Sequence, residues 1–326
     1  MVLIDPGSGD LSADGLFFKT QRSARFYWLT RPLESRGMVM RFGLRKFALI
    51  CSVLGLSLTC VAAELKRETI VAFDRYIAAT EERINSEERP GGTFLYVDGQ
   101  PPDAMNGSYA KLRNGEVLVE KRETRSSGVS SHVPDGMIHH WVGIVFIPGA
   151  TMAQVLPIVR DYDRRAELYK PEVTASHMIS SQGDDYRFFL RLYQKRFTTV
   201  VLNSEYVSHW GTVDSKKAYS HSISTKIAEI KDPDRPDGEE WPVGQGRGYL
   251  WRLNTYWRFE EKDGGIYMQC EAVALTRDIP FALGWLIKPL VTKIPRESLN
   301  RALGQTRTAV LEEKKAAYGR PGSSLP

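Results

Sequence analysis

The sequence has little cysteine, which limits how the folded chain can be stabilised. Its three cysteines are Cys51, Cys60 and Cys270, and the first two lie in an apolar segment typical of an export signal. After removal of that segment Cys270 has no cysteine partner within the chain, so we expect stability to come from a hydrophobic core. We interpret Cys270 as a small buried hydrophobic residue.

The chain also contains no glycine-rich phosphate loop, no GxSxG and no HExxH motif, which argues against three common types of enzyme active site. Histidine is scarce as well, and the adjacent His139 and His140 would lie on opposite faces of a strand, too far apart to bind one metal ion. The other histidines are isolated, at His132, His177, His209 and His221. The sequence therefore predicts no metal site, no cofactor and no catalytic residue.

Excess positive charge is confined to the first part of the chain. The formal net charge is +5, and residues 1–63 alone hold eight Lys/Arg against four Asp/Glu. The rest of the chain carries 36 basic and 35 acidic side chains. Binding to the phosphate backbone of nucleic acid requires a concentration of basic side chains, so we predict no nucleic-acid partner.

An apolar run at residues 47–60 is shorter than the roughly 20 residues that cross a bilayer. It follows three basic residues and precedes small residues at Val61 and Ala63. This pattern predicts a secretory signal over residues 38–63, cleaved before Glu64, and hence an exported protein that is periplasmic or extracellular. The alternative is an uncleaved signal that anchors the chain in the membrane.

Residues 1–37 would precede that signal, whereas a secretory signal begins a protein. We therefore expect the natural start to be Met38 or Met40. Residues 1–37 are interpreted as an extension that results from a misplaced gene start.

The rest of the chain is interpreted as an accessory segment over residues 64–134, a main domain over residues 135–318 and a flexible tail at 319–326. Apolar residues at spacings of three and four predict an amphipathic helix over residues 64–88. The other elements predicted for the accessory segment are strands at 93–97 and 116–120 and loops at 98–107 and 121–134. Because the segment is too small for a core of its own, we expect it to pack on the main domain.

The main domain is predicted to be an α+β structure with an antiparallel sheet and a long C-terminal helix. Its strand candidates are separated by short, turn-rich connections, and strands joined in this way pair antiparallel. The predicted strands cover residues 138–147, 172–180, 186–194, 198–209, 218–230, 248–259 and 266–276. The predicted helices cover residues 151–159, 164–169 and 295–318. Gly304 and several alanines would let the last helix approach the sheet closely.

One of these strands contains the sequence Y-L-W-R-L-N-T-Y-W-R-F at residues 249–259. Successive side chains of a strand point to opposite faces, so Tyr249, Trp251, Trp257 and Phe259 share one face with Leu253. The other face carries Arg252 and Arg258. We predict that the aromatic face lines a pocket and that the two arginines face solvent.

Two stretches of the main domain resemble a known superfamily. The first predicted strand runs into V-F-I-P-G-A-T-M-A-Q-V-L-P-I-V-R-D-Y-D, and the C-terminal part begins R-D-I-P-F-A-L-G-W-L-I-K-P-L-V-T-K-I-P-R-E-S-L. Together with the order of elements, they resemble the START/polyketide cyclase-like (SRPBCC) superfamily over residues 138–314. The resemblance implies a helix-grip fold, a curved antiparallel sheet closed by the C-terminal helix. It also implies a hydrophobic ligand, such as a lipid or quinone, between sheet and helix.

The predicted ligand-binding side chains come from the inner faces of the strands and the last helix. They are Trp251, Leu253, Trp257, Phe259, Met268, Cys270, Leu299, Leu303, Thr306 and His221. Tyr219 and Tyr256 are further candidates for a polar group that orients the ligand. An entrance is predicted in the apolar connection at residues 278–291, at Ile279, Phe281 and Trp285, where the protein would open or touch a membrane.

The sequence thus predicts an exported binding or carrier protein for a hydrophobic small molecule. An enzyme of cyclase, aromatase or hydrolase type on the same fold is one alternative. The other is a protein interaction module whose docking surface is the accessory segment.

Overall fold

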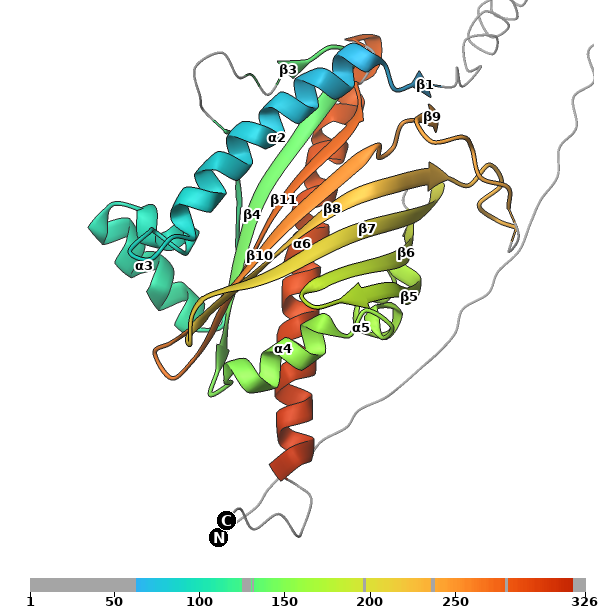
Figure 1. Ribbon diagram of the computed structural model, residues 1–326. Coiled ribbons are helices and arrows are strands. Elements are labelled where there is room, and N and C mark those ends of the chain that lie inside the picture. Colours follow the sequence, from blue (N-terminus) through green and yellow to red (C-terminus); the bar gives the residue numbers. More distant parts are fainter. Residues whose placement is uncertain are drawn as a thin grey trace, which may run out of the picture. The chain divides into compact units, whose positions relative to one another are not determined.

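The computed structural model describes residues 63–124, 130, 132–195, 198–235, 238–278 and 281–318 (Figure 1). For residues 281–292 and 317–318 only the backbone is described. The extension at 1–37, almost all of the predicted signal at 38–63 and the tail at 319–326 lie outside the described residues. Everything described belongs to one compact unit that starts at Cys60.

The described strands form a nine-stranded antiparallel sheet in the order β2-β4-β11-β10-β8-β7-β6-β5, with β3 paired to β4. The bounds of the strands are β2 Leu118–Lys121, β3 His132–Val133, β4 Gly136–Pro148, β5 Val173–Gln182, β6 Asp185–Lys195, β7 Thr199–Asp214, β8 Lys217–Glu229, β10 Arg252–Lys262 and β11 Gly265–Arg277. A separate small pair joins β1 (Ala63–Glu64) to β9 (Gln245–Gly246). The predicted antiparallel pairing of the main domain is confirmed, as is its predicted order of elements along the chain, a strand, two helices, further strands and a long helix.

A tight hairpin connects the two strands at the middle of the sheet. Asp263 and Gly264 both have positive φ, 54° and 72°, between the paired residues Lys262 and Gly265. A two-residue turn with positive φ at both positions matches the twist of the strands that it joins, and Asp-Gly favours it. The turn fixes the register in which β10 and β11 present their side chains.

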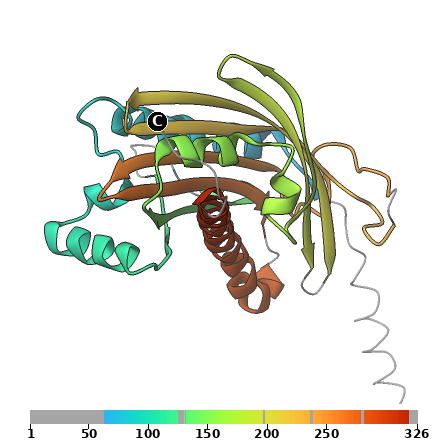
Figure 2. The same cartoon turned by 90° about the horizontal axis from the view of Figure 1, so that it is seen from below.

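Helices cover both faces of the sheet. The accessory helix α2 (Arg67–Glu87) crosses one face, while α4 (Met152–Arg160), α5 (Arg165–Leu168) and α6 (Phe281–Tyr318) lie on the other, toward which the sheet curves (Figures 1 and 2). We call the α6 side the concave face and the α2 side the outer face. Among the described helices, none is long and apolar enough to span a membrane.

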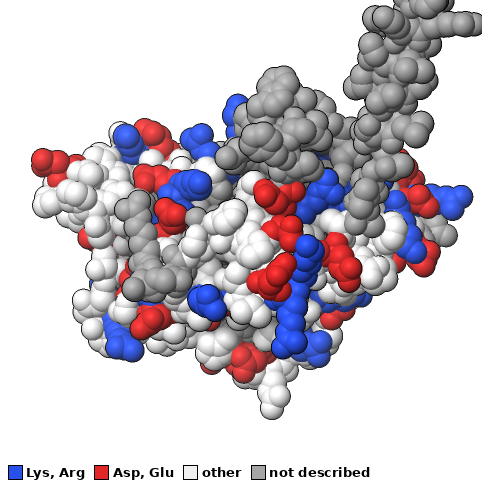
Figure 3. Space-filling model, turned by 90° about the horizontal axis from the view of Figure 1, so that it is seen from above, with Lys and Arg blue, Asp and Glu red and all other residues white. Residues whose placement is uncertain are grey.

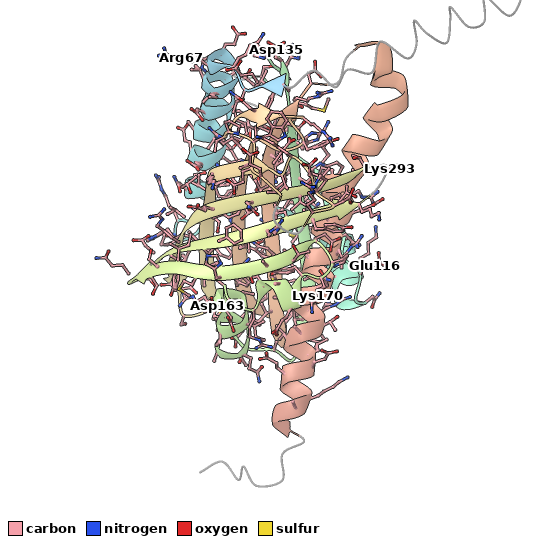
Figure 4. The ribbon with its side chains drawn as sticks, turned by 90° about the vertical axis from the view of Figure 1, so that its right-hand side faces the viewer. Arg67, Glu116, Asp135, Asp163, Lys170 and Lys293 are labelled. Atoms are coloured by element: carbon pink, nitrogen blue, oxygen red, sulfur yellow. The ribbon has the colours of Figure 1, made fainter. Side chains whose placement is uncertain are left out.

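The C-terminal helix begins earlier than predicted. We expected a connection at residues 278–291 and a helix from 295, but α6 already starts at Phe281. Pro289 and Pro295 both lie within the helix, where a proline bends the axis because it removes one backbone N–H. Figure 4 shows α6 changing direction around Lys293, between the two prolines.

The close approach of this helix to the sheet depends on a glycine of the sheet. A Cβ on Gly143 of β4 would lie 2.6 Å from Cδ1 of Leu303 and 3.0 Å from Cγ of Leu299. A Cβ on Gly304 would have no atom within 4 Å. The prediction that Gly304 makes the close approach is therefore wrong.

The accessory segment also differs from its predicted elements. The amphipathic helix is confirmed as α2. The strand predicted at 93–97 is wrong, because residues 93–95 form no strand and residues 96–97 belong to a 3-10 helix, η2 (Tyr96–Gly99). The expected loop at 98–107 contains the start of α3 (Pro102–Arg113). The carboxylate of Asp98 accepts the backbone N–H of Leu95 at 3.1 Å and closes the first turn. Pro102 then starts α3, as proline does at a first helical position.

The accessory segment buries the outer face of the sheet. Phe73, Tyr76 and Ile84 of α2 pack against Val273 and Leu275 of β11. Arg258 of β10, which we predicted to face solvent, is only 1 % exposed and pairs with glutamates at the end of α2. The prediction that Arg258 faces solvent is wrong, because the polar face of the strand packs against the polar end of α2. Arg252, for which we made the same prediction, is half-buried.

Candidate functional site

Near the hairpin that joins β10 and β11, the side chains of the concave face form a solid core. Phe259, Met268 and Cys270 on β10 and β11 pack in one cluster with Leu299 and Leu303 of α6. All five side chains are buried. The structure therefore brings five of the predicted ligand-binding residues together, and here they contact one another.

Farther from the hairpin that joins β10 and β11, the side chains of these strands that point to the concave side are only half-buried. Their neighbours on the outer face, Asn254, Tyr256 and Val273, are buried. We define the open concave surface by the half-buried inward residues Trp141, Leu253, Thr255, Trp257, Ala272 and Ala274. Trp141, Ala272 and Thr255 lie in register across three strands, so the surface is continuous.

Small side chains contribute to this opening. The inward residues of the next strand, β8, are Ser220, Ser222 and Ser224, and Ser222 donates a hydrogen bond to Ser208 of β7 at 2.9 Å. The three serines are buried and, like Ala272 on β11, occupy less of the curve of the sheet than large side chains would. A surface made of two tryptophans, a leucine and small residues is apolar with few polar groups, as in ligand pockets.

An aromatic cluster borders the open concave surface. The ring of Phe188 stacks on Tyr162 at 4.2 Å and on Tyr206 at 5.1 Å between centroids. Leu253 packs against this cluster, so it links the aromatic rings to the open concave surface. Tyr162 also accepts a hydrogen bond from Nε1 of Trp210 at 2.9 Å.

Polar groups reach the concave side from the short helices and α6. Thr306 donates its hydroxyl proton to the carbonyl of Ala302 at 2.9 Å, so Tyr169 must donate in the 3.1 Å contact between the two hydroxyls. The predicted Thr306 therefore lies on the concave side with its hydrogen bonds satisfied. Burial raises the pKa of the Cys270 thiol, which keeps this residue protonated and agrees with its interpretation as a hydrophobic residue.

Two predicted ligand-binding residues lie on the outer face instead. Trp251 precedes β10 and packs with Phe73 and Tyr76 of α2, because the strand starts only at Arg252. Nε2 of His221 lies 2.9 Å from the carboxylate of Glu88. Their assignment to the pocket is wrong.

The other two candidates for an orienting polar group also face outward. Tyr256 donates to Glu81 of α2 at 2.8 Å, and the ring of Tyr219 lies beside His221. The register between β8 and β10 places Tyr256 opposite His221, which explains why all three share one face. None of them orients a ligand on the concave face.

The predicted entrance remains a prediction. Ile279 lies outside the described residues. Phe281 and Trp285 belong to the first turns of α6, and their side chains are not described.

A buried polar network beneath α2 was not predicted. Tyr76 and His140 are joined at 2.8 Å between the hydroxyl and Nδ1, and Nε2 of His140 lies 2.5 Å from Glu271, which also pairs with Arg83. Burial alone would raise the pKa of Glu271, but His140 together with two arginines lowers it to about 2. Tyr76, His140 and Glu271 are buried between helix and sheet and Arg83 is half-buried, so the network holds α2 on the sheet.

Surface charge and surface grooves do not mark a second site. The end of the molecule shown in Figure 3 mixes Lys and Arg with Asp and Glu, so that view has no patch of one sign. A surface groove of about 620 Å³ runs along α6 beside α4 and α5, and its lining includes Arg164, Glu167, Arg301 and Glu312. Among the described residues, no group of His, Cys, Asp and Glu is arranged to hold a metal ion.

The topology defines the class of protein. An antiparallel sheet whose first long strand leads into two short helices, and which curves around a long C-terminal helix, is the START-like helix-grip fold predicted from the sequence. No protein-family model and no curated protein sequence matches the chain.

Solved structures with this type of fold align to the chain at low identity. A STAR-related lipid transfer protein from Xanthomonas axonopodis is 15% identical, covering 60% of this chain and 93% of that one with a TM-score of 0.42. The Zhui aromatase/cyclase from Streptomyces sp. R1128 is 12% identical, with 56% and 99% covered and a TM-score of 0.37. A START superfamily protein from Mycobacterium smegmatis is 11% identical, with 54% and 99% covered and a TM-score of 0.36. We transfer no ligand or activity from them.

Proposed function

We propose that this protein binds or carries a hydrophobic small molecule on the open concave surface, between the sheet and α6. The observation that carries the proposal is the partial exposure of Leu253, Thr255 and Trp257 on the concave side, while Asn254, Tyr256 and Arg258 on the outer side of the same strand are buried. Exposed apolar area of this kind is stabilised when a ligand covers it, by about 25 cal/mol per Å². Affinity would come from that burial, less the cost of association.

Binding of a fluorescent long-chain alcohol to the full chain tests the proposal. Trp257→Ala removes a large apolar contact from the open concave surface and should weaken binding at least about tenfold, equivalent to about 1.4 kcal/mol. Trp241→Ala is the matched control, because Trp241 lies in the connection between β8 and β10 beside Lys231. Equal affinity of the wild type and the Trp257 variant would overturn the assignment of this surface.

The accessory segment supports this proposal over an interaction module. The apolar face of α2, with Phe73, Tyr76, Ile77 and Ile84, is buried against the sheet and is not available to a partner. The segment therefore acts as a cover for the outer face, and the concave face carries the binding function.

We further propose that the protein is exported and contacts a membrane transiently when it takes up or releases its ligand. The signal pattern at residues 38–63 supports export, and the apolar residues from Phe281 onward support membrane contact. N-terminal sequencing of the protein recovered from cell fractions tests the first part. A product that begins at Glu64 outside the cytoplasm is expected, and one that retains Met1 would contradict it.

A further inference from the structure

Two arginines on the concave side lack an acidic partner. The guanidinium of Arg165 lies over the rings of Tyr162 at 4.5 Å and Phe188 at 5.3 Å, and that of Arg160 lies over Trp210 at 4.5 Å. Nε of each arginine is buried and has no hydrogen-bond partner. Within the described ranges, no carboxylate forms an ion pair with either one.

Several other arginines of the fold do have acidic partners. Arg83 and Arg258 pair with glutamates beneath α2, and Arg301 of α6 pairs with Glu172 at 2.8 Å. Arg164, next to Arg165 in sequence, is 61% exposed and pairs with Glu167. Arg160 and Arg165 are half-buried, and burying the Nε–H of a cation without a partner costs free energy, so their unpaired Nε groups call for an explanation.

One hydrogen bond of the Arg165 guanidinium has a structural role. Its Nη2 donates to the carbonyl of Val159 at 2.8 Å and so caps the end of α4. That bond uses one of the five N–H donors of the guanidinium. The aromatic rings hold its plane in a fixed orientation, and the remaining donors are available to an anion.

A second unpartnered group lies beside the same rings. The hydroxyl of Tyr206 has no hydrogen-bond partner although the residue is only 4% exposed, and its ring stacks on Phe188, over which Arg165 also lies. Burial raises the pKa of Tyr206 to about 12, with the neighbouring Ser204 side chain and then the charge of Arg165 acting in the opposite direction, so the hydroxyl keeps its proton near neutral pH. A cation and an unused donor thus flank Phe188.

The position of these groups relative to the open concave surface suggests the shape of the ligand. Leu253 packs on the cluster of Tyr162, Phe188 and Tyr206 and also belongs to the open concave surface. A chain that covers Leu253 and Trp257 would bring one of its ends to Arg165. Such a molecule would have an apolar body and a negatively charged head.

We propose that Arg165, assisted by Tyr206, binds the anionic head group, a carboxylate or a phosphate, of an amphipathic ligand whose apolar part lies on the open concave surface. This inference rests on the proposed function, and it names the class of ligand. Arg160 adds positive potential on the same side. Charge-assisted hydrogen bonds of this kind contribute more than neutral ones.

Three ligands of equal chain length test the inference by calorimetry on the full chain: dodecanoate, dodecyl phosphate and dodecanol. The wild type should bind at least one of the anions about tenfold or more tightly than the alcohol. Arg165→Gln should remove this preference and leave the affinity for dodecanol unchanged, while Arg165→Lys should restore part of it. The tighter anion identifies the head group as carboxylate or phosphate.

Control variants separate head-group recognition from a structural effect. Arg164→Gln changes an exposed neighbour and should leave all three affinities unchanged. If Arg165→Gln does not fold, Tyr206→Phe removes only an unpaired hydroxyl and should weaken binding of the preferred anion several-fold. Equal binding of anions and alcohol by the wild type, or an equal loss for all three ligands in the Arg165 variant, would overturn the inference while the proposed function stands. Failure of all three ligands to bind would instead contradict the proposed function.

Discussion

Arg258 of β10 and Glu88 at the end of α2 form an ion pair, with 3.0 Å between Nε and Oε1, that is buried between the accessory segment and the outer face of the sheet. The same guanidinium also donates to Glu87 and to the carbonyl of Phe94, each at 2.8 Å. One side chain thus joins the sheet to the end of α2 and to the segment before η2. The accessory segment is therefore an integral part of the fold.

Removal of this guanidinium should be strongly destabilising. Arg258→Met keeps much of the apolar volume but leaves Glu87 and Glu88 without their cation, and breaking a buried ion pair on one side costs about 3–5 kcal/mol. Urea denaturation measures the change in the free energy of unfolding. Lys66→Met breaks the exposed ion pair with Asp135 and should have little effect. A loss for Arg258→Met as small as that of the control would show that the pair does not hold the segment.

The two glycines at the interface of α6 should respond in opposite directions to the same substitution. Gly143→Ala places a methyl group against Leu303 and Leu299, so we expect a loss of about 1–3 kcal/mol from overpacking. Gly304→Ala meets no atom and should stabilise α6 by up to about 1 kcal/mol through helix propensity. Thermal unfolding of both variants measures this difference. Equal shifts in Tm would argue against the close contact between β4 and α6.

Acidification should destabilise the protein, beginning in the pH range in which His139 would take up a proton in the unfolded chain. Burial lowers the pKa of His139 to about 4, and Lys121 acts in the same direction. Because the unfolded histidine has a pKa of about 6.5, the folded state binds the proton more weakly, and stability is lost as the pH falls from about 6.5 toward 4. The slope should reach about 1.4 kcal/mol per pH unit for this group.

Unfolding midpoints between pH 7 and pH 4 check this slope. His139→Gln should flatten it, while His209→Gln, a change at an exposed position, should leave it unchanged. His140, whose pKa burial also lowers, contributes in the same range, and Glu271 adds a further loss only below about pH 4.5. A slope that is unchanged in the His139 variant would contradict the prediction.

Substitution of the predicted entrance should slow exchange with membranes. Phe281→Ala and Trp285→Ala remove apolar groups that would contact a bilayer, so transfer of a fluorescent fatty acid from lipid vesicles should become several-fold slower. Stopped-flow fluorescence measures the rate, and equilibrium binding in the absence of vesicles should change little. Trp241→Ala serves as the control, and a transfer rate equal to wild type in both variants would remove the entrance assignment.

The order of elements in the main domain was predictable because its signals are local. The turn at Asp263 and Gly264 depends only on neighbours in the sequence, and so does the two-residue periodicity of β10. The turn and the strand both lie within a few residues of where the sequence predicts them. The face to which an individual side chain points was harder to predict. Trp251, for example, precedes β10, so the alternation of side chains along the strand does not apply to it. Arg164 and Arg165 are equivalent in sequence, and only the path of α5 decides which one reaches the aromatic cluster (Figure 4 shows α5 between Asp163 and Lys170).

By itself, the sequence determined the antiparallel sheet, the long C-terminal helix, the amphipathic accessory helix and the apolar character of the surface around Trp257, because periodicity and turn chemistry are properties of short segments. Tertiary structure alone decided which face of the sheet α2 covers. It therefore also decided that Arg258 and His221 are partners of glutamates and that Arg165 remains without one. Burial and pairing depend on segments far apart in the chain, and their positions follow from the packing of the whole domain.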